Sequence, residues 1–177
     1  MRCVAIGGEP ATGKTTLVSK IYDTLNEPKG FKFGLVRGHV DNTRNLALLG
    51  IYGTGETFLG TDKLAMNVNP HFLKYAEKRS RNLLFEGDRL FTGANLQKLM
   101  AMYETRVIIL KASAEDLHER HKQRGDTQTA KFLQGRQTKT ANIQKQLGEV
   151  IELHYLRKIE DTSNLAKDLL SWLSNGQ

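Results

Sequence analysis

The sequence has one cysteine and no long apolar run, and each shortage excludes a class of protein. The single cysteine, Cys3, excludes an internal disulfide and a zinc site built from cysteines. It stands at the start of an apolar run, so we expect a buried structural thiol. No apolar run approaches the length needed to cross a bilayer, and the N-terminus leads straight into the first one without room for a signal peptide. We therefore expect a cytoplasmic protein with no membrane partner.

Acidic residues are also scarcer than basic ones. The chain of 177 residues carries 26 Lys and Arg against 19 Asp and Glu, a formal net charge of +7. This excess favours a polyanionic partner, although an enzyme that handles small nucleotides can be basic for those substrates alone. The length suits one domain over residues 1–177, and no repeat, low-complexity tract or linker divides it.

The most informative stretch is CVAIGGEPATGKTTL, residues 3–17, which contains Gly8-x-x-x-x-Gly13-Lys14-Thr15. The apolar residues before the motif predict a buried strand, and those after it fall on one face of a helix. This is the setting of a P-loop, in which backbone N–H groups and a helix N-terminus surround a phosphate. The motif predicts that the chain binds a nucleoside triphosphate.

The side chains of the motif have distinct expected roles. Lys14 is expected to bridge the β- and γ-phosphates as a catalytic residue, the Thr15 hydroxyl to ligate Mg²⁺, and Thr16 to reach a neighbouring phosphate oxygen. The expected cofactors are therefore ATP and Mg. The expected nucleotide-binding residues are Gly8, Glu9, Pro10, Ala11, Thr12, Gly13, Lys14, Thr15 and Thr16.

Apolar runs alternate with helical patterns along the chain, which is typical of an α/β protein whose parallel sheet is covered on both faces. We expect a P-loop NTPase fold with a parallel five-stranded sheet flanked by helices, and a basic lid segment. The expected strands are 4–6, 33–36, 82–85, 106–110 and 150–156. Helices are expected over 113–123, capped by Ser113, and from about residue 162.

Residues 38–70 interrupt this regularity, because they are rich in Gly, Thr and Asn and have few apolar residues. Such a stretch in a compact domain is usually a functional loop, and we expect it to bind the acceptor. Tyr52 and Phe58 are candidates to stack on a base while Asp62 or Asn67 reads its edge. The alternative is that the aromatic residues belong to the core beneath the loop.

Charged residues directly follow the strand expected at 33–36. The ends of strands line the ligand crevice of a doubly wound sheet, so we expect this segment to face the P-loop. Asp41 is then a candidate catalytic base, and Arg44 or Arg37 could hold an acceptor phosphate. The alternative is a helix-capping aspartate beside solvated arginines.

Two carboxylates follow the strand expected at 82–85. Acidic residues at the end of a strand beside a P-loop orient Mg²⁺ in such enzymes, and either Glu86 or Asp88 can serve. The sequence does not choose between them, and a solvated turn is the alternative.

The segment from His118 to Lys139 is strongly basic and is interrupted by Gly125 and Gly135. We expect it to form a lid over about residues 120–140 that closes over the triphosphate. Arg124 and Arg136 are expected to stabilise the charge on the transferring phosphoryl group. A solvated helix face is the alternative.

Taken together, these residues resemble the P-loop kinases. Asp41 and Arg44 match an Asp-x-x-Arg that follows the second strand of polynucleotide kinases, where the Asp is the general base. The segments GTGETFLGTDKLAMNVNP, LLFEGDRLF and FLQGRQTKTANI more specifically resemble bacteriophage kinases of the 5-hydroxymethyluracil DNA kinase type, which serve thymine hypermodification. The resemblance covers nearly the whole chain.

This resemblance implies an ATP- and Mg²⁺-dependent kinase that phosphorylates the hydroxymethyl group of 5-hydroxymethyluracil in DNA. A second basic cluster suits DNA as a partner, although such clusters are often only solubilising surface. Its members are Lys74, Lys78, Arg79 and Arg81. Two alternatives stay open: a kinase of a free nucleoside, a nucleotide or a nucleic-acid 5′ end, and a nucleotide-binding switch without an acceptor.

Overall fold

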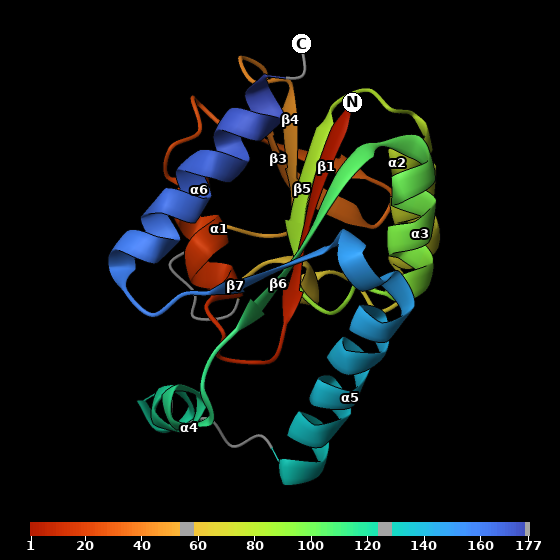
Figure 1. Cartoon of the computed structure of the whole chain (residues 1–177). Coiled ribbons are helices and arrows are strands. Elements are labelled where there is room, and N and C mark those ends of the chain that lie inside the picture. The colour runs from red at the N-terminus through yellow and green to blue at the C-terminus, as the bar shows by residue number, and fades with distance from the viewer. Residues whose placement is uncertain (54–58, 124–128, 176–177) are drawn as a thin grey trace.

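The computed structural model describes residues 1–53, 59–123 and 129–175 (Figure 1). They form a seven-stranded sheet in the order β2-β3-β4-β5-β1-β6-β7. The strands are β1 (Arg2–Gly8), β2 (Lys29–Phe33), β3 (Val36–Asp41), β4 (Leu46–Leu49), β5 (Asn82–Glu86), β6 (Glu104–Lys111) and β7 (Ile151–Tyr155). The α-helices are α1 (Lys14–Tyr22), α2 (Asn69–Glu77), α3 (Gly93–Met102), α4 (Ala114–Gln123), α5 (Ala130–Leu147) and α6 (Ile159–Ser174), and two 3₁₀ turns are η1 (Thr61–Lys63) and η2 (Gly148–Val150).

The predicted parallel strand at 33–36 is wrong. Phe33 ends β2 and Val36 begins β3, and these two strands pair antiparallel as a hairpin. Gly34, at φ 58°, lies in the turn between them, where the backbone must reverse. The sheet therefore has two more strands than predicted, because β2 and β3 extend a parallel set of β4, β5, β1, β6 and β7.

The fifth parallel strand is β4, a fully buried Leu46–Leu49 run inside the segment predicted to be a loop. Residues 38–70 therefore also contain part of β3 and the η1 turn. The other predicted strands correspond to β1, β5, β6 and β7, and the helix capped by Ser113 is α4. The Ser113 hydroxyl accepts a hydrogen bond from the Asp116 backbone nitrogen at 3.0 Å, as the capping pattern predicts.

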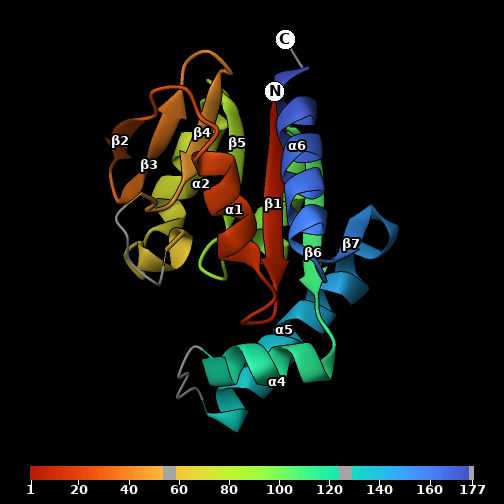
Figure 2. The same ribbon diagram turned by 90° about the vertical axis from the view of Figure 1, so that its left-hand side faces the viewer.

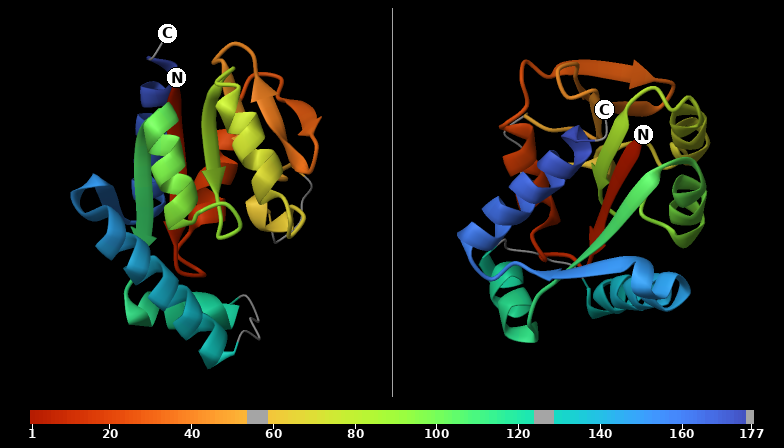
Figure 3. Two further views of the ribbon diagram at one scale, coloured as in Figure 1. Left: turned by 90° about the vertical axis from the view of Figure 1, so that its right-hand side faces the viewer. Right: turned by 45° about the horizontal axis from the view of Figure 1, so that its top comes forward.

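Side chains of the central strands alternate between two apolar layers. In β1, Cys3 and Ala5 pack on the side of α2 and α3, whereas Val4 and Ile6 pack on the side of α1 and α6. Figures 2 and 3 show these helix pairs on opposite faces of the sheet. Cys3 is fully buried, which confirms the expected structural thiol, and burial raises its pKa well above the usual value. The two layers hold β1 firmly in the middle of the molecule.

The carboxyl ends of the five parallel strands share one edge of the sheet. After β1 the chain enters strands on one side of it, and after β5 it crosses to β6 on the other side. Open α/β sheets bind ligands at such a switch point, beyond the carboxyl ends of the strands. Helices α4 and α5 lie beyond this same edge (Figures 1 and 2). In the part of the chain that the structure describes, no helix is both long and apolar enough to cross a membrane.

Candidate active site

The loop between β1 and α1 depends on two glycines. Gly8 ends β1 at φ 132° and Gly13 precedes α1 at φ 96°, in a region that side chains rarely adopt. A Cβ on Gly8 would also collide with the Leu110 carbonyl oxygen of β6. Because Gly13 caps α1 without a side chain, the first backbone N–H groups of the helix face the loop. The predicted strand, glycine loop and helix are confirmed, and the expected nucleotide-binding residues lie in this loop and the first turn of α1.

The Lys14 side chain lies over this β1–α1 loop. Its Nζ donates to the carbonyl oxygens of Gly8 at 2.9 Å and Glu9 at 2.8 Å. The Thr12 hydroxyl donates to the same Glu9 carbonyl at 2.8 Å and tightens the turn. An ammonium group and the positive end of the α1 dipole thus act on one small volume. An anion in the loop would meet both.

Glu86 ends β5, the neighbour of β1, and is 2% exposed. The Thr15 hydroxyl donates to its Oε1 at 3.2 Å. The pKa of Glu86 is raised to about 7: burial is the main cause, the charges of Asp62 and Asp88 also raise it, and the charge of Lys14 and the Thr15 hydrogen bond act against them. Of the two carboxylates that the sequence left open, Glu86 is the one the structure brings to Thr15.

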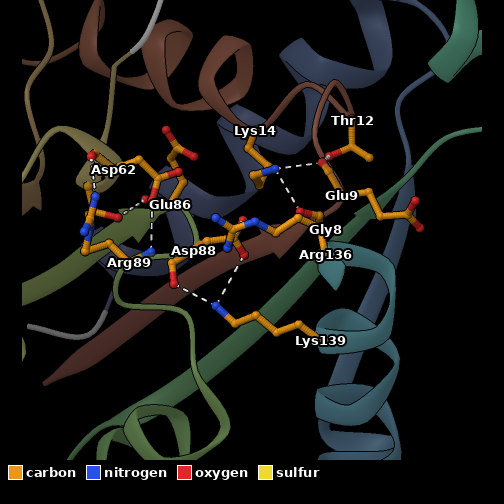
Figure 4. A network of polar contacts seen from close by, with 11 residues as sticks. Gly8, Glu9, Thr12, Lys14, Asp62, Glu86, Asp88, Arg89, Arg136 and Lys139 are labelled. Carbon is orange, nitrogen blue, oxygen red and sulfur yellow. Dashed lines mark hydrogen bonds and ion pairs between the residues drawn. The ribbon is translucent and has the colours of Figure 1, made fainter. Parts of the chain in front are cut away.

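Asp88 instead binds helix α5, as Figure 4 shows. Arg136 Nη1 lies 3.1 Å from its Oδ2. Lys139 Nζ donates to its backbone carbonyl at 2.7 Å and approaches Oδ1 at 3.4 Å. The Arg136 guanidinium also lies over the Phe132 ring, 4.7 Å from its centroid. Asp88 therefore ties α5 to the turn after β5.

Asp62 lies in η1, beside this turn. The Arg89 backbone nitrogen donates to Asp62 Oδ1 at 2.9 Å, and Arg89 Nη2 donates to the Asp62 carbonyl at 3.0 Å. Thr61 joins η1 to β5, since its hydroxyl donates to the Glu86 carbonyl at 2.6 Å. Asp62 is exposed, and its charge acts on Glu86. It is a carboxylate at the open side of the site.

Arg120 of α4 closes the other side of the β1–α1 loop. Its guanidinium donates to the carbonyls of Ala11 at 3.2 Å and Leu156 at 3.1 Å. It lines a pocket of about 330 Å³ between the loop, α4 and the start of α6, to which Thr16 and Ile159 also contribute. Arg120, Arg89 and Lys139 are site residues that the sequence did not single out. Two of them belong to the predicted basic lid, whose composition gives no reason to prefer one cation over another.

The oxygen atoms of Thr15 and Glu86 suit a hard cation that takes its remaining ligands from water or substrate. Thr15 and Glu86 offer one hydroxyl and one carboxylate. Within residues 1–53, 59–123 and 129–175, no group of three or more His, Cys, Asp or Glu side chains is placed to hold a metal ion. Mg²⁺ usually takes one or two protein oxygens and completes its shell with water and substrate phosphates. The pair fits Mg²⁺ on those terms.

The prediction that Asp41 and Arg44 face the β1–α1 loop is wrong. Asp41 is in register with Leu46 of β4, which pairs with Asn82 at the start of β5. Because β3 runs antiparallel to β4, Asp41 lies at the edge opposite to the carboxyl ends of the parallel strands, about 20 Å along the strands from the loop. A catalytic base at Asp41 would therefore be out of reach of Lys14.

Asp41 holds a turn together instead. Its carboxylate accepts hydrogen bonds from the Asn26 backbone nitrogen at 3.0 Å, the Thr43 hydroxyl at 2.5 Å and the Arg44 guanidinium at 2.6 Å. Burial alone would raise its pKa, but these hydrogen bonds outweigh burial and lower the pKa to about 2. The alternative of a helix-capping aspartate beside solvated arginines is also wrong, because Asp41 ends β3 before a turn and Arg44 is paired with it.

The remaining predicted acceptor residues do not form one binding surface. Tyr52 is 2% exposed and stacks on Tyr22 with ring centroids 6.0 Å apart, so it is a core residue, as the alternative held. Burial, and then the charges of Glu86 and Asp62, raise its pKa well above the usual value, so its hydroxyl borders the site from the core side. Arg37 is exposed on β3. Phe58 and Arg124 lie outside the described residues.

Comparison with known proteins finds likeness among solved structures alone. No family model matches the chain, and no curated protein matches it. Among solved structures, it is similar to a sugar kinase from Janibacter sp. HTCC2649 determined without ligand, with a TM-score of 0.52 and 18% sequence identity. The match covers 98% of this chain and 94% of that one. The fold is therefore similar to that of this sugar kinase. At this identity the likeness shows the fold alone.

We expect Asp41→Asn to lower stability without lowering turnover selectively. The variant loses a buried carboxylate whose hydrogen bonds are charge-assisted, and a shift of the pKa from 3.8 to about 2 corresponds to about 2 kcal/mol at neutral pH. Since the folded pKa is the lower one, this contribution is present above pH 4 and is lost as the pH falls through about 2. Urea unfolding at neutral and acid pH measures it. Unchanged stability with a large loss of turnover would return Asp41 to the catalytic site.

We expect Asp88→Asn to loosen α5. The ion pairs with Arg136 and Lys139 are partly buried, so the free energy of global unfolding should change by less than about 1 kcal/mol. Hydrogen exchange of backbone amides in the first half of α5 should nevertheless become faster. Glu152→Gln is the matched control, because it removes a carboxylate from the Arg106 ion pair between β6 and β7. Identical exchange in both variants would mean that Asp88 does not anchor the helix.

Proposed function

We propose that this chain is an ATP- and Mg²⁺-dependent kinase that transfers the γ-phosphate to the hydroxymethyl group of 5-hydroxymethyluracil in DNA. The observation that carries the phosphotransfer part is the junction of β1 and β5. There Lys14 lies over a glycine loop and the Thr15 hydroxyl contacts the buried Glu86 carboxylate. These are the groups that a P-loop needs to hold a triphosphate and orient its metal ion.

The triphosphate would lie along the P-loop. The backbone N–H groups at the start of α1 and the Lys14 ammonium would bind its β- and γ-phosphates. Phosphate oxygens would then take the place of the two carbonyl oxygens that Lys14 contacts in the structure. The adenine base of ATP would enter the pocket lined by Arg120, Thr16 and Ile159, whose volume of about 330 Å³ is in the range of small-ligand sites. Thr15 and Glu86 would hold Mg²⁺, which when bound neutralises charge on the phosphate oxygens.

Asp62 is the carboxylate that we assign as general base. It is exposed at the side of the site next to Gly87, whereas Glu86 contacts Thr15 and Asp88 is paired with two cations of α5. As the acceptor hydroxyl oxygen bonds to the γ-phosphorus, the bond from that phosphorus to the β–γ bridging oxygen breaks, and Asp62 takes the hydroxyl proton. ADP is the leaving group.

Two arguments support 5-hydroxymethyluracil in DNA as the acceptor. The resemblance to 5-hydroxymethyluracil DNA kinases names the substrate class, and the net charge of +7 suits a polyanion. The similarity to a solved sugar kinase supports an alcohol acceptor in general. That similarity also favours a second candidate function, phosphorylation of a small free hydroxyl compound such as a sugar or nucleoside.

Radiolabelled phosphate transfer from γ-labelled ATP tests the proposal. We expect label on an oligonucleotide that contains 5-hydroxymethyluracil, and much less on the free nucleoside, on a sugar or on unmodified DNA with a 5′-hydroxyl. Lys14→Ala should lower transfer by about 10²–10³-fold with the fold intact, because its charge acts where negative charge develops. Labelling of the sugar or nucleoside alone would favour the second candidate, and hydrolysis that no acceptor stimulates would indicate a switch.

We expect Asp62→Asn to lower kcat by about 10²–10⁴-fold while the affinity for ATP changes little, because an amide cannot accept the proton. Asp88→Asn is the control for the neighbouring carboxylate, which is engaged by α5; its loss should loosen that helix and lower kcat less than loss of the base does. Single-turnover transfer and equilibrium ATP binding separate the two effects. A larger loss of kcat in the control would assign the base to Asp88.

A further inference from the structure

A second group of cations lies on the β2–β3 hairpin. Lys32 and Arg37 face each other directly across the antiparallel pair, and both are exposed. Among the described residues, neither side chain has a hydrogen-bond or ion-pair partner. Like charges directly opposite each other on neighbouring strands destabilise a sheet. An anion between them would remove this repulsion.

The surface around this pair is hollowed. Lys32 and Arg37 line a pocket of about 320 Å³ together with Lys63 of η1, and a second pocket of about 390 Å³ with His39. The described linings of both pockets contain no carboxylate. The floor of the second pocket is partly glycine, because Gly30, Gly38 and Gly50 line it. The cations thus surround a recess that polar anionic groups can enter.

This recess lies at the same sheet edge as Lys14. The β2–β3 turn is at the carboxyl end of the parallel strands, because Gly38 pairs with Leu49 and only Asp41 reaches the opposite edge. Strand β3 is three positions from β1 in the sheet, about 14 Å. Lys63 also directly follows Asp62 in η1. The recess and the β1–α1 loop are therefore two separate places along one sheet edge, which suits a strand that spans both with neighbouring nucleotides.

We propose that Lys32 and Arg37, in the recess that Lys63 also lines, form a phosphate-binding site that holds a backbone phosphate of the DNA acceptor, next to the nucleotide that is phosphorylated. The inference rests on the proposed function, and it adds a point of attachment outside the groups that hold the triphosphate. The pocket favours polymeric DNA over a free nucleoside, since only a strand can occupy both places at once.

Binding of a fluorescent oligodeoxythymidylate without ATP tests the pocket. The double variant Lys32→Ala/Arg37→Ala should weaken binding about tenfold at low salt, and the slope of log K against log salt should fall by about 0.7 for each lost phosphate contact. Lys167→Ala, an exposed lysine on α6, is the matched control and should bind as the wild type does. The melting temperature of the double variant should stay the same or rise, because a repulsive pair is removed.

Several outcomes would overturn the proposal. Unchanged affinity and salt slope in the double variant would show that no phosphate binds there, and a lower melting temperature would make the cations structural. Displacement of the oligonucleotide by thymidine monophosphate at an equal concentration of phosphate would assign the pocket to a free nucleotide. Because the assay needs no phosphoryl transfer and no modified base, its result is independent of the labelling experiment on the proposed function.

Discussion

The burial of Glu86 beside Lys14 is the interaction on which the rest of the site depends. A carboxylate at 2% exposure is costly unless donors and a counter-charge surround it, and Thr15 and Lys14 supply both. Turn η1 also contacts this residue, since the Thr61 hydroxyl donates to the Glu86 backbone carbonyl. Strand β5, helix α1 and turn η1 are therefore joined at one residue, α1 through the Glu86 side chain and η1 through its backbone carbonyl, and the position of Asp62 follows from theirs.

Most of the fold on the β1 side could be predicted from the sequence, because short apolar runs bounded by charge identify buried parallel strands. The hairpin could not. An apolar pattern says that 33–36 is partly buried, but it does not give the direction of a strand, and Gly34 reverses the chain in the middle of that run. This one reversal carried Asp41 to the opposite edge of the sheet. The error in the catalytic base was therefore an error in strand direction.

The site was predictable where its residues are neighbours in the sequence. The motif around Lys14 determines its own geometry through two glycines, and Glu86 follows its strand directly. Contacts between distant segments were not predictable, because any of several lid cations could have met Asp88. That pairing holds α5 beyond the carboxyl edge of the sheet. It also means that Asp88 and Arg136, expected in separate roles, act first on each other.

Gly60 carries a consequence for recognising relatives of this chain. At φ 85° it adopts a backbone conformation that other residues rarely take, and a methyl group there would run into the Glu86 carboxylate. A relative that keeps the same buried acid is therefore expected to keep glycine at this position. Gly60-Thr61-Asp62 and Glu86-Gly87-Asp88 then form a paired signature, about twenty-five positions apart, for searches where overall similarity has faded.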